Sequence, residues 1–291
     1  MSTLLEKAAS PEILADAWRR FKNDNAIWST GLPRVDMEKQ LAYHLLTLAS
    51  ELRSGTYRPD PVRSFVVQKG DGGTRKIVAF TLRDKIAQRA VLTVLEPLGE
   101  RIFHPGSYAY RQGRNTAMAV ERIAEFARSG LPWAVSADIL NCFDTIPRQP
   151  LLAGVKKSVT ADGKVLQLIQ RWIETTAVPK TRARHTGIGI PQGAVLSPFL
   201  CNVYLTAFDN SLAAKRIRFV RFADNVFALA GSREGAAEIR KRLAQELHRL
   251  GMELNQAKTK IVRYGPEVKF LGRSLPHLGR RERACIRENR W

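Results

Sequence analysis

The chain has 291 residues, with 47 Lys and Arg against 27 Asp and Glu, so its formal net charge is +20. A hydrophobic content of 44% excludes a disordered chain. No apolar run is long enough to span a bilayer, and Met1–Lys7 lacks the basic start and apolar core of a signal peptide. The positive charge favours a polyanionic partner that Lys and Arg neutralise through its phosphates, although a basic proteome or acidic lipid would also account for it.

The cysteines indicate the redox setting. Cys142, Cys201 and Cys285 are odd in number, far apart and without CxxC spacing. They form no disulfide framework or zinc motif, and a reducing cytoplasm is the expected location.

The first half of the chain is predicted to be mainly helical. Apolar residues from Met37 to Leu52 recur at helical spacing, and Gly55 can end that helix. Two β-rich runs, Val62–Gln68 and Ile77–Phe80, flank a glycine-rich turn that carries Lys69 and Arg75. Such a basic turn suits a phosphate group, and a solvated turn is the alternative.

Two further helices are expected next. Thr81 has capping-box character and opens a helix that we expect to end before Pro97. A second helix is predicted from about Thr116 to Arg128, stopping at Gly130.

The second half mixes strands and helices. A mostly apolar strand, Leu131–Ile139, has Asp138 near its end. Apolar spacing then predicts helices over Lys164–Thr175, Phe199–Phe208 and Ile239–Leu250, and a last hairpin closed by Lys269–Gly272.

The stretch Arg216–Ala230 predicts a hairpin. Its two apolar runs are separated by Ala223, Asp224 and Asn225, and Asp and Asn tolerate turn backbone angles. The turn would project the Asp224 carboxylate beyond two buried strands. Taken alone, the stretch favours an ordinary surface turn, and only the other stretches of the chain reverse that interpretation.

Asp138 and Asp224 therefore stand at strand edges in apolar surroundings, which is costly for a carboxylate without a cation. A divalent ion would neutralise them, and Mg²⁺ prefers oxygen ligands. Two such ions could activate a hydroxyl and stabilise a leaving pyrophosphate. The alternative is that Asp138 only caps the following turn.

These stretches, in this order, resemble the reverse transcriptases of bacterial mobile elements, closest to the group II intron lineage. The resemblance covers about Gly31 to Gly272. Its palm motifs are SADILNCFDTI, GIPQGAVLSPFLCNVYL, RFADN, LNQAKTKI and KFLG, and its fingers motifs include SGTYRPDPVR, TLRDKIAQRAV and SYAYRQGR.

The resemblance implies roles for individual residues. Asp138, Asp224 and the Ile139 carbonyl would bind metal, and Lys258 would protonate pyrophosphate unless it is only an exposed lysine of the basic groove. Phe143 would exclude a 2′-hydroxyl, or is simply a core aromatic, and Asp144 is assigned to turn capping. The remaining assigned residues would bind nucleotide and template. Lys69 and Arg75 would bind the triphosphate. The surface under the nascent base pair would be formed by Pro191, Gln192 and Gly193.

Two departures from the family pattern matter. Asn225 stands where the family usually has a second aspartate, which removes one negative charge and predicts weaker Mg²⁺ binding that Mn²⁺ would rescue. Full activity, manganese-favoured activity and an inactive enzyme all stay open. Only 19 residues follow Gly272, fewer than a helical thumb needs, so we expect poor processivity unless a partner supplies the grip.

The resemblance implies an α+β right-hand polymerase fold of fingers and palm, with an antiparallel palm sheet backed by helices and the thumb largely absent. We expect a helical N-terminal region and the fingers over 1–130, the palm over 131–272 with a helical fingers/palm segment at 157–185, and a short basic tail over 273–291. The expected function is an RNA-directed DNA polymerase using Mg²⁺ or Mn²⁺, dNTPs, an RNA template and a DNA or RNA primer.

We expect this polymerase to work in a larger assembly, such as one for CRISPR adaptation or antiviral defence. In that assembly a partner protein or a structured RNA would replace the thumb. We expect no association with a membrane. The alternatives are a nucleic-acid-binding subunit of little or no activity and a template-independent nucleotidyl transferase.

Overall fold

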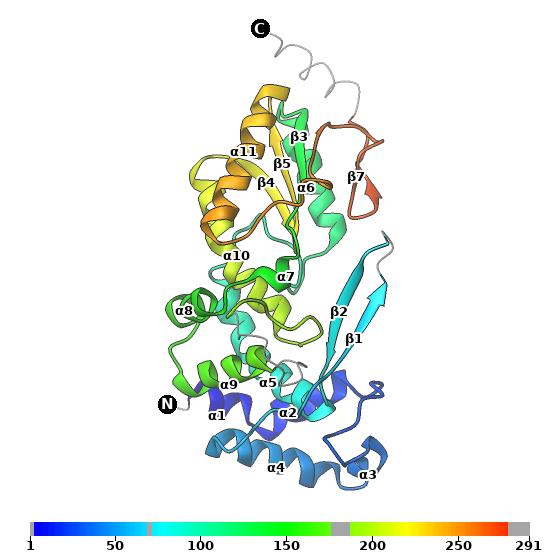
Figure 1. The fold of residues 1–291 in the computed structure, drawn as a ribbon, viewed down its shortest axis with the longest axis vertical. Coiled ribbons are helices and arrows are strands. Elements are labelled where there is room, and N and C mark those ends of the chain that lie inside the picture. The colour runs from blue at the N-terminus through cyan, green and yellow to red at the C-terminus, as the bar shows by residue number, and fades with distance from the viewer. Residues whose placement is uncertain (1–2, 69–71, 176–186, 279–291) are drawn as a thin grey trace. The chain divides into compact units, whose positions relative to one another are not determined.

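The computed structural model describes residues 3–68, 72–175 and 187–278 (Figure 1). The chain forms two compact units, each assembled from two separate parts of the sequence. Unit 1 comprises Met1–Ile102 and Ile146–Val203, and unit 2 comprises Phe103–Thr145 and Tyr204–Trp291. The assignment of fingers and palm to particular ranges stays a prediction.

Unit 1 is built mainly of helices and carries one largely exposed hairpin. Its strands are β1 (Arg63–Gln68) and β2 (Thr74–Ala79), which pair antiparallel. Its helices are α1 (Leu4–Ala8), α2 (Pro11–Arg20), α3 (Arg34–Glu38), α4 (Leu41–Ser54), α5 (Leu82–Glu100), α8 (Arg148–Ser158) and α9 (Gly163–Glu174). Helix α10 (Ser197–Ala214) begins in unit 1 and ends in unit 2.

The helix ends follow the sequence signals at two places and depart from them at another. Gly55 ends α4 in the left-handed region, with a φ of +78°, and the Thr81 hydroxyl caps α5 by accepting from the Asp84 N–H. The expectation that α5 ends before Pro97 is wrong, because the helix continues to Glu100. Proline removes one backbone hydrogen bond, and burial of Leu95 and Gly99 outweighs that loss.

A buried polar network ties α5 to α9 inside unit 1. Asp84 is fully buried and accepts hydrogen bonds from the Tyr57 hydroxyl and, at 2.9 Å, from the Asp60 N–H. The Trp172 indole donates to the same Tyr57 hydroxyl at 3.0 Å. Burial raises the pKa of Asp84 to about 6, and the nearby Asp60 charge adds to the rise, although the Tyr57 hydrogen bond opposes it.

Unit 2 is built on a four-stranded antiparallel sheet, which we call the central sheet, with strand order β4-β5-β3-β6. Its strands are β3 (Trp133–Asp138), β4 (Arg218–Phe222), β5 (Asn225–Ala230) and β6 (Lys260–Arg263). A separate short hairpin pairs β7 (Lys269–Phe270) with β8 (Arg273–Ser274). The other helices of unit 2 are α6 (Thr116–Arg128), α7 (Cys142–Thr145) and α11 (Arg233–Arg249).

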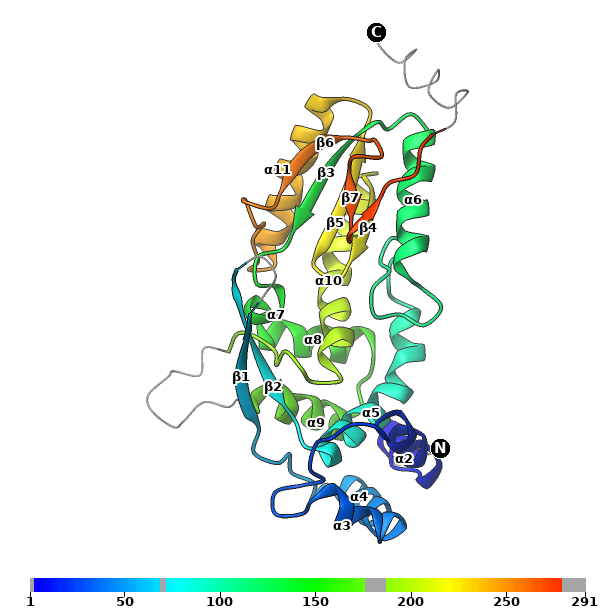
Figure 2. The same cartoon turned by 90° about the vertical axis from the view of Figure 1, so that its right-hand side faces the viewer.

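Helices cover both faces of the central sheet, with α6 on one side and α11 on the other (Figure 2). Ile123 of α6 belongs to a core cluster with Val220, Phe227 and Leu229 of the sheet. Phe270 of the short hairpin joins this cluster, its ring 5.5 Å from that of Phe227. The buried strands explain the near-continuous apolar runs in the sequence, and they hold the loops at one sheet end in fixed positions.

The predicted fold class is confirmed. The chain combines helices with antiparallel sheets, and the apolar runs around Asp138 and Asp224 are adjacent strands. Among the helices in the described ranges, none combines the length and apolar composition that a bilayer-spanning segment requires.

Candidate active site

The predicted hairpin forms, and its turn carries Asp224. Phe222 pairs with Asn225, so Ala223 and Asp224 make the connection, and we call Phe222–Asn225 the Asp224 turn. Ala223 has a φ of +56°, a left-handed conformation that residues with a side chain rarely adopt. Such a turn is strained, and neighbouring groups must hold it in place.

The buried Arg221 side chain fixes the Asp224 turn through hydrogen bonds. Its Nη1 donates to the Ala223 carbonyl oxygen at 3.1 Å. Its Nε and Nη2 donate to the two carboxylate oxygens of Asp209 in α10, at 2.7 and 2.6 Å, and Nη2 also donates to the Ser107 hydroxyl at 3.0 Å. Arg221 and Asp209 are both fully buried. A buried pair of this kind fixes orientation, because breaking it leaves an uncompensated charge.

Strand β3 places Asp138 beside the Asp224 turn. Asp138 lies opposite Asn225 in the antiparallel register, and the Ile139 N–H donates to the Asp224 carbonyl oxygen at 2.9 Å. The two aspartates that the sequence singles out thus occupy the same end of the central sheet, within unit 2. Both residues are half-buried.

Each of these carboxylates accepts a hydrogen bond from an asparagine amide. Asn225 Nδ2 donates to Asp224 Oδ1 at 3.0 Å, and Asn255 Nδ2 donates to Asp138 Oδ1 at 3.3 Å. The backbone N–H of Asn255 also donates to the Asp138 carbonyl oxygen, at 2.7 Å. Sequence reasoning misses Asn255, for which the one signal is its position in LNQAKTKI, just after an apolar residue.

Lys258 belongs to the turn that Asn255 begins. Its backbone N–H lies 3.2 Å from the Asn255 carbonyl oxygen and 3.3 Å from Oδ1 of the same residue. Leu254, immediately before, forms an antiparallel bridge with Ile139. The lysine turn is therefore attached to the same sheet end as Asp138, and Lys258 itself is exposed.

Phe143 and Asp144 lie in the short helix α7, which follows β3. Asn141 precedes this helix in the left-handed region, with a φ of +46°, and its carbonyl oxygen accepts from the Asp144 N–H at 2.8 Å. Phe143 is half-buried and Asp144 is exposed. The assignment of Asp144 to turn capping stays a prediction.

The remaining assigned residues belong to unit 1. Arg75 is exposed on β2, and Lys69 lies outside the described residues. Pro191 is buried, and the Gln192 carbonyl oxygen accepts from the Val78 N–H at 2.7 Å. Gly193 has a φ of +111°, and a Cβ there would lie 2.3 Å from the Val78 carbonyl oxygen, so only glycine fits against β2.

The donor set at the Asp224 turn fits hard divalent cations. Among the described residues no group of three or more His, Cys, Asp or Glu side chains is placed to hold a metal. The two aspartates and the Ile139 carbonyl would nevertheless offer oxygen ligands only, and Mg²⁺ usually completes its shell with water and substrate phosphates. Two protein carboxylates therefore suffice for an ion that shares its shell with a nucleotide.

An antiparallel sheet backed by helices, with two aspartates at one end, is the arrangement that right-hand nucleotide polymerases use for catalysis. The chain belongs to the family described as reverse transcriptase (RNA-dependent DNA polymerase), whose sequence model matches residues 67–275. The resemblance to reverse transcriptases of the group II intron lineage and the assignment to the RNA-directed DNA polymerases are both confirmed. Enzymes of this family generally use divalent metal ions such as Mg²⁺.

Curated relatives include a protein encoded by a group II intron. It is 28% identical to Protein YkfC of Escherichia coli K12, covering 94% of this chain and 82% of that protein. It is 26% identical to the group II intron-encoded protein LtrA of Lactococcus lactis, covering 77% of this chain but 48% of LtrA.

Solved structures share the fold. A partial Cas6-RT-Cas1–Cas2 complex matches with a TM-score of 0.52 and 25% identity, over 85% of this chain and 42% of that chain. The telomerase of Candida albicans matches with a TM-score of 0.53 at 14% identity, over 81% of this chain and 50% of that one, which shows the fold alone. The chain thus spans about half the length of LtrA and of these structures.

Proposed function

We propose that this chain copies an RNA template into DNA at the Asp224 turn, using two divalent metal ions. One observation carries the proposal: the β3–β5 register places Asp138 and Asp224 at the same end of the central sheet. Asp138, Asp224 and the Ile139 carbonyl would hold the ions. When bound, the ions would activate the primer 3′-hydroxyl and stabilise the leaving pyrophosphate.

The neighbouring residues would orient the two aspartates and select the incoming nucleotide. The amides of Asn225 and Asn255 each donate to one aspartate, which restricts the directions in which its oxygens point. Lys258 would give a proton to the departing pyrophosphate. Phe143 would exclude a 2′-hydroxyl on the incoming sugar.

In unit 1, assigned residues would bind the nucleotide and support the new base pair. Lys69 and Arg75 would bind the triphosphate. The Pro191–Gly193 segment would support the nascent pair, and its attachment to Val78 makes it rigid.

Primer extension on a defined RNA template with labelled dNTPs tests this proposal. Mg²⁺ and Mn²⁺ are compared, with Asp224→Asn and Asp138→Asn as inactivating variants and the exposed Asp144→Asn as the matched control. We expect template-dependent product from the wild type and from the control, no product from either inactivating variant, and a preference for Mn²⁺ because Asn225 lowers the negative charge.

Three other outcomes would contradict the proposal. Product that does not depend on the template would indicate a template-independent transferase. No product with either metal, together with salt-sensitive RNA binding, would indicate a binding subunit. Undiminished product from Asp224→Asn would place the chemistry elsewhere.

We also propose that the chain works within a larger nucleoprotein assembly in the cytoplasm. The match to a reverse transcriptase inside a Cas6-RT-Cas1–Cas2 complex supports a protein partner, and the net charge of +20 supports an RNA component. The test is native mass spectrometry of the tagged chain from its own host, before and after ribonuclease. A defined stoichiometric complex is expected, and a lone chain with full extension activity would oppose it.

A further inference from the structure

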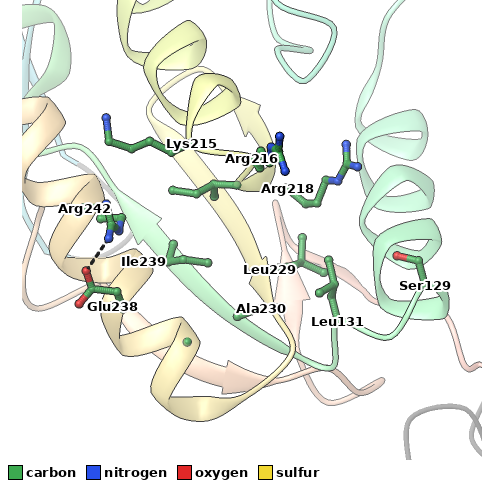
Figure 3. Close-up of a pocket in the computed structure, with 12 residues that line it drawn as sticks. Ser129, Leu131, Lys215, Arg216, Arg218, Leu229, Ala230, Glu238, Ile239 and Arg242 are labelled. Carbon is green, nitrogen blue, oxygen red and sulfur yellow. Dashed lines mark ion pairs between the residues drawn. The ribbon is translucent and has the colours of Figure 1, made fainter. Parts of the chain in front are cut away.

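Unit 2 contains a second candidate site, a cavity of about 860 Å³ at the far end of the central sheet. It is lined by the beginning of β4, the end of β5 and one side of α11. Arg218 pairs with Leu229 there, whereas the Asp224 turn lies at the opposite end of the same two strands. The four steps from Arg218 to Phe222 separate the two sites by about 13 Å. We call this cavity the Arg218 pocket (Figure 3).

The lining of the Arg218 pocket is strongly cationic. Four basic side chains line it, against the single carboxylate of Glu238. These basic residues are Lys215, Arg216, Arg218 and Arg242. The surplus of positive charge at one concave surface favours an anionic ligand.

Two of the four basic side chains of the pocket are paired with a carboxylate, and two are not paired with any in the described part of the chain. Arg242 pairs with Glu238 at 3.1 Å, and Lys215 pairs with Glu246 at 3.0 Å. Arg216 and Arg218 are exposed and form no ion pair with a described carboxylate, and Figure 3 shows both on the same side of the pocket. Arginine binds phosphate with a planar fork and stacks on bases, so this pair suits a nucleic-acid backbone.

The floor of the pocket is aliphatic. Leu131, Leu229 and Ile239 line it between the charged groups, as Figure 3 shows for Leu229 and Ile239. A volume within the usual range of ligand pockets, with an apolar floor and a basic rim, matches a planar base and its attached phosphate. A simple phosphate site would not need the apolar surface.

The backbone at Arg216 gives an independent observation. Helix α10 ends in a Schellman motif, in which the Ile217 N–H donates to the Leu212 carbonyl oxygen and the Arg216 N–H to that of Ala213. Arg216 occupies the left-handed position of this motif, with a φ of +58°, where glycine is favoured. The sequence thus carries a long cationic side chain at a position where it costs stability, which points to a role other than folding.

We propose that the Arg218 pocket binds an unpaired nucleotide of an RNA strand, at a site separate from the Asp224 turn. Arg216 and Arg218 contact its phosphates, and the aliphatic floor receives its base. The choice of RNA over an acidic protein rests on the proposed function, since the family acts on RNA. Occupancy of the pocket itself requires neither metal nor catalysis.

The test measures RNA binding without chemistry. Fluorescence anisotropy of a labelled 12-nucleotide oligouridine is recorded with the full chain in EDTA, without dNTPs. The variant is Arg216→Gly/Arg218→Gln, and the matched control, Lys157→Gln/Lys241→Gln, removes the same charge from two exposed helical positions. We expect the variant to weaken binding about tenfold, and the control to change it less than about twofold. The negative slope of log K against log salt should also become shallower by about 1.4 in the variant.

Two further readouts separate a binding role from a structural one. Arg216→Gly alone should raise the Tm by about 2–4 °C while it weakens RNA binding, because glycine relieves the left-handed strain. Crosslinking of 4-thiouridine RNA should label peptides that contain Arg216–Arg218 or Ile239–Arg242.

Specific outcomes would overturn the proposal. One is equal loss of RNA affinity in variant and control, and another is crosslinks confined to unit 1. A third is binding of polyglutamate that is as tight, and as sensitive to the variant, as binding of the RNA. Because the assay contains no metal, loss of primer extension with this binding intact would count against the Asp224 site alone.

Discussion

Arg221 and Asp209 form a fully buried two-pronged ion pair directly beneath the Asp224 turn. The same guanidinium donates to the carbonyl of Ala223, the left-handed residue that precedes Asp224. The pair therefore joins α10 to the turn that carries a proposed metal ligand. Its loss should affect the position of Asp224 as well as stability.

Replacing both members of the pair separates these two effects. Arg221→Leu alone should destabilise the protein by about 3–5 kcal/mol, because it leaves the Asp209 charge buried without a partner. The double variant Arg221→Leu/Asp209→Leu should recover most of that stability, since apolar pairs often replace buried ion pairs at little cost. Its primer extension should nevertheless stay at least about tenfold below wild type, because a 1 Å displacement of a reacting group is already costly.

Urea unfolding and single-turnover extension measure the two effects. Arg221→Lys serves as the conservative variant, because it keeps the positive charge and loses the two-pronged guanidinium contact with Asp209. Its extension rate should lie between those of the wild type and the double variant. A double variant with wild-type extension would show that Arg221 stabilises the fold without positioning the turn.

Asn225 provides a second test, through metal dependence. The Asn225→Asp variant replaces an amide that donates to Asp224 with a second carboxylate beside it. Without metal, the two like charges repel, and the Tm in EDTA should fall below that of wild type. With Mg²⁺ the variant should gain more Tm than wild type, because a ligand of the folded state stabilises it in proportion to its affinity.

Thermal melts in EDTA, Mg²⁺ and Mn²⁺ give this comparison without any activity assay. In the same variant, the metal preference of primer extension should shift from Mn²⁺ toward Mg²⁺. Identical metal-induced Tm shifts in variant and wild type would show that residue 225 does not face the ions.

The sequence predicts the elements of the site better than their contacts. The apolar runs of β3, β4 and β5 predict strands with Asp138 and Asp224 at their ends, because alternation and turn residues are local signals. Whether those ends are adjacent depends on strand order and register. These are set by the packing of both faces of the central sheet, and the sequence alone does not specify them.

The residues that support the two aspartates are not predictable from the sequence alone. Arg221 interrupts an apolar strand and Asp209 an apolar helix, and each looks locally like an isolated charge. Only the fold pairs them, just as it brings Asn255 to Asp138 across 117 positions of sequence. A charge inside a buried element was the available signal, since such a charge requires a partner.

Gly193 should be intolerant of any side chain. A Cβ in Gly193→Ala would lie 2.3 Å from the Val78 carbonyl oxygen, and the φ of +111° is unfavourable for alanine. The backbone must shift and weaken the hydrogen bond between Val78 and Gln192, at a cost of about 1–3 kcal/mol. Urea unfolding measures this cost. The matched control Gly163→Ala, at the first residue of α9 with open space around it, should be neutral or slightly stabilising.

Asp84 should make stability fall as pH rises. Its folded pKa of about 6 lies above its unfolded value of 3.8, so between these values the folded chain binds more protons than the unfolded chain. Stability from this group is therefore complete below about pH 4 and lost as pH rises to about 6, by roughly 2–3 kcal/mol. Asp84→Asn keeps the shape without the charge, so its stability relative to wild type should rise across this window. Urea unfolding of both proteins between pH 4 and 7 tests the sign, and a constant difference would show that Asp84 titrates alike in the folded and unfolded chain.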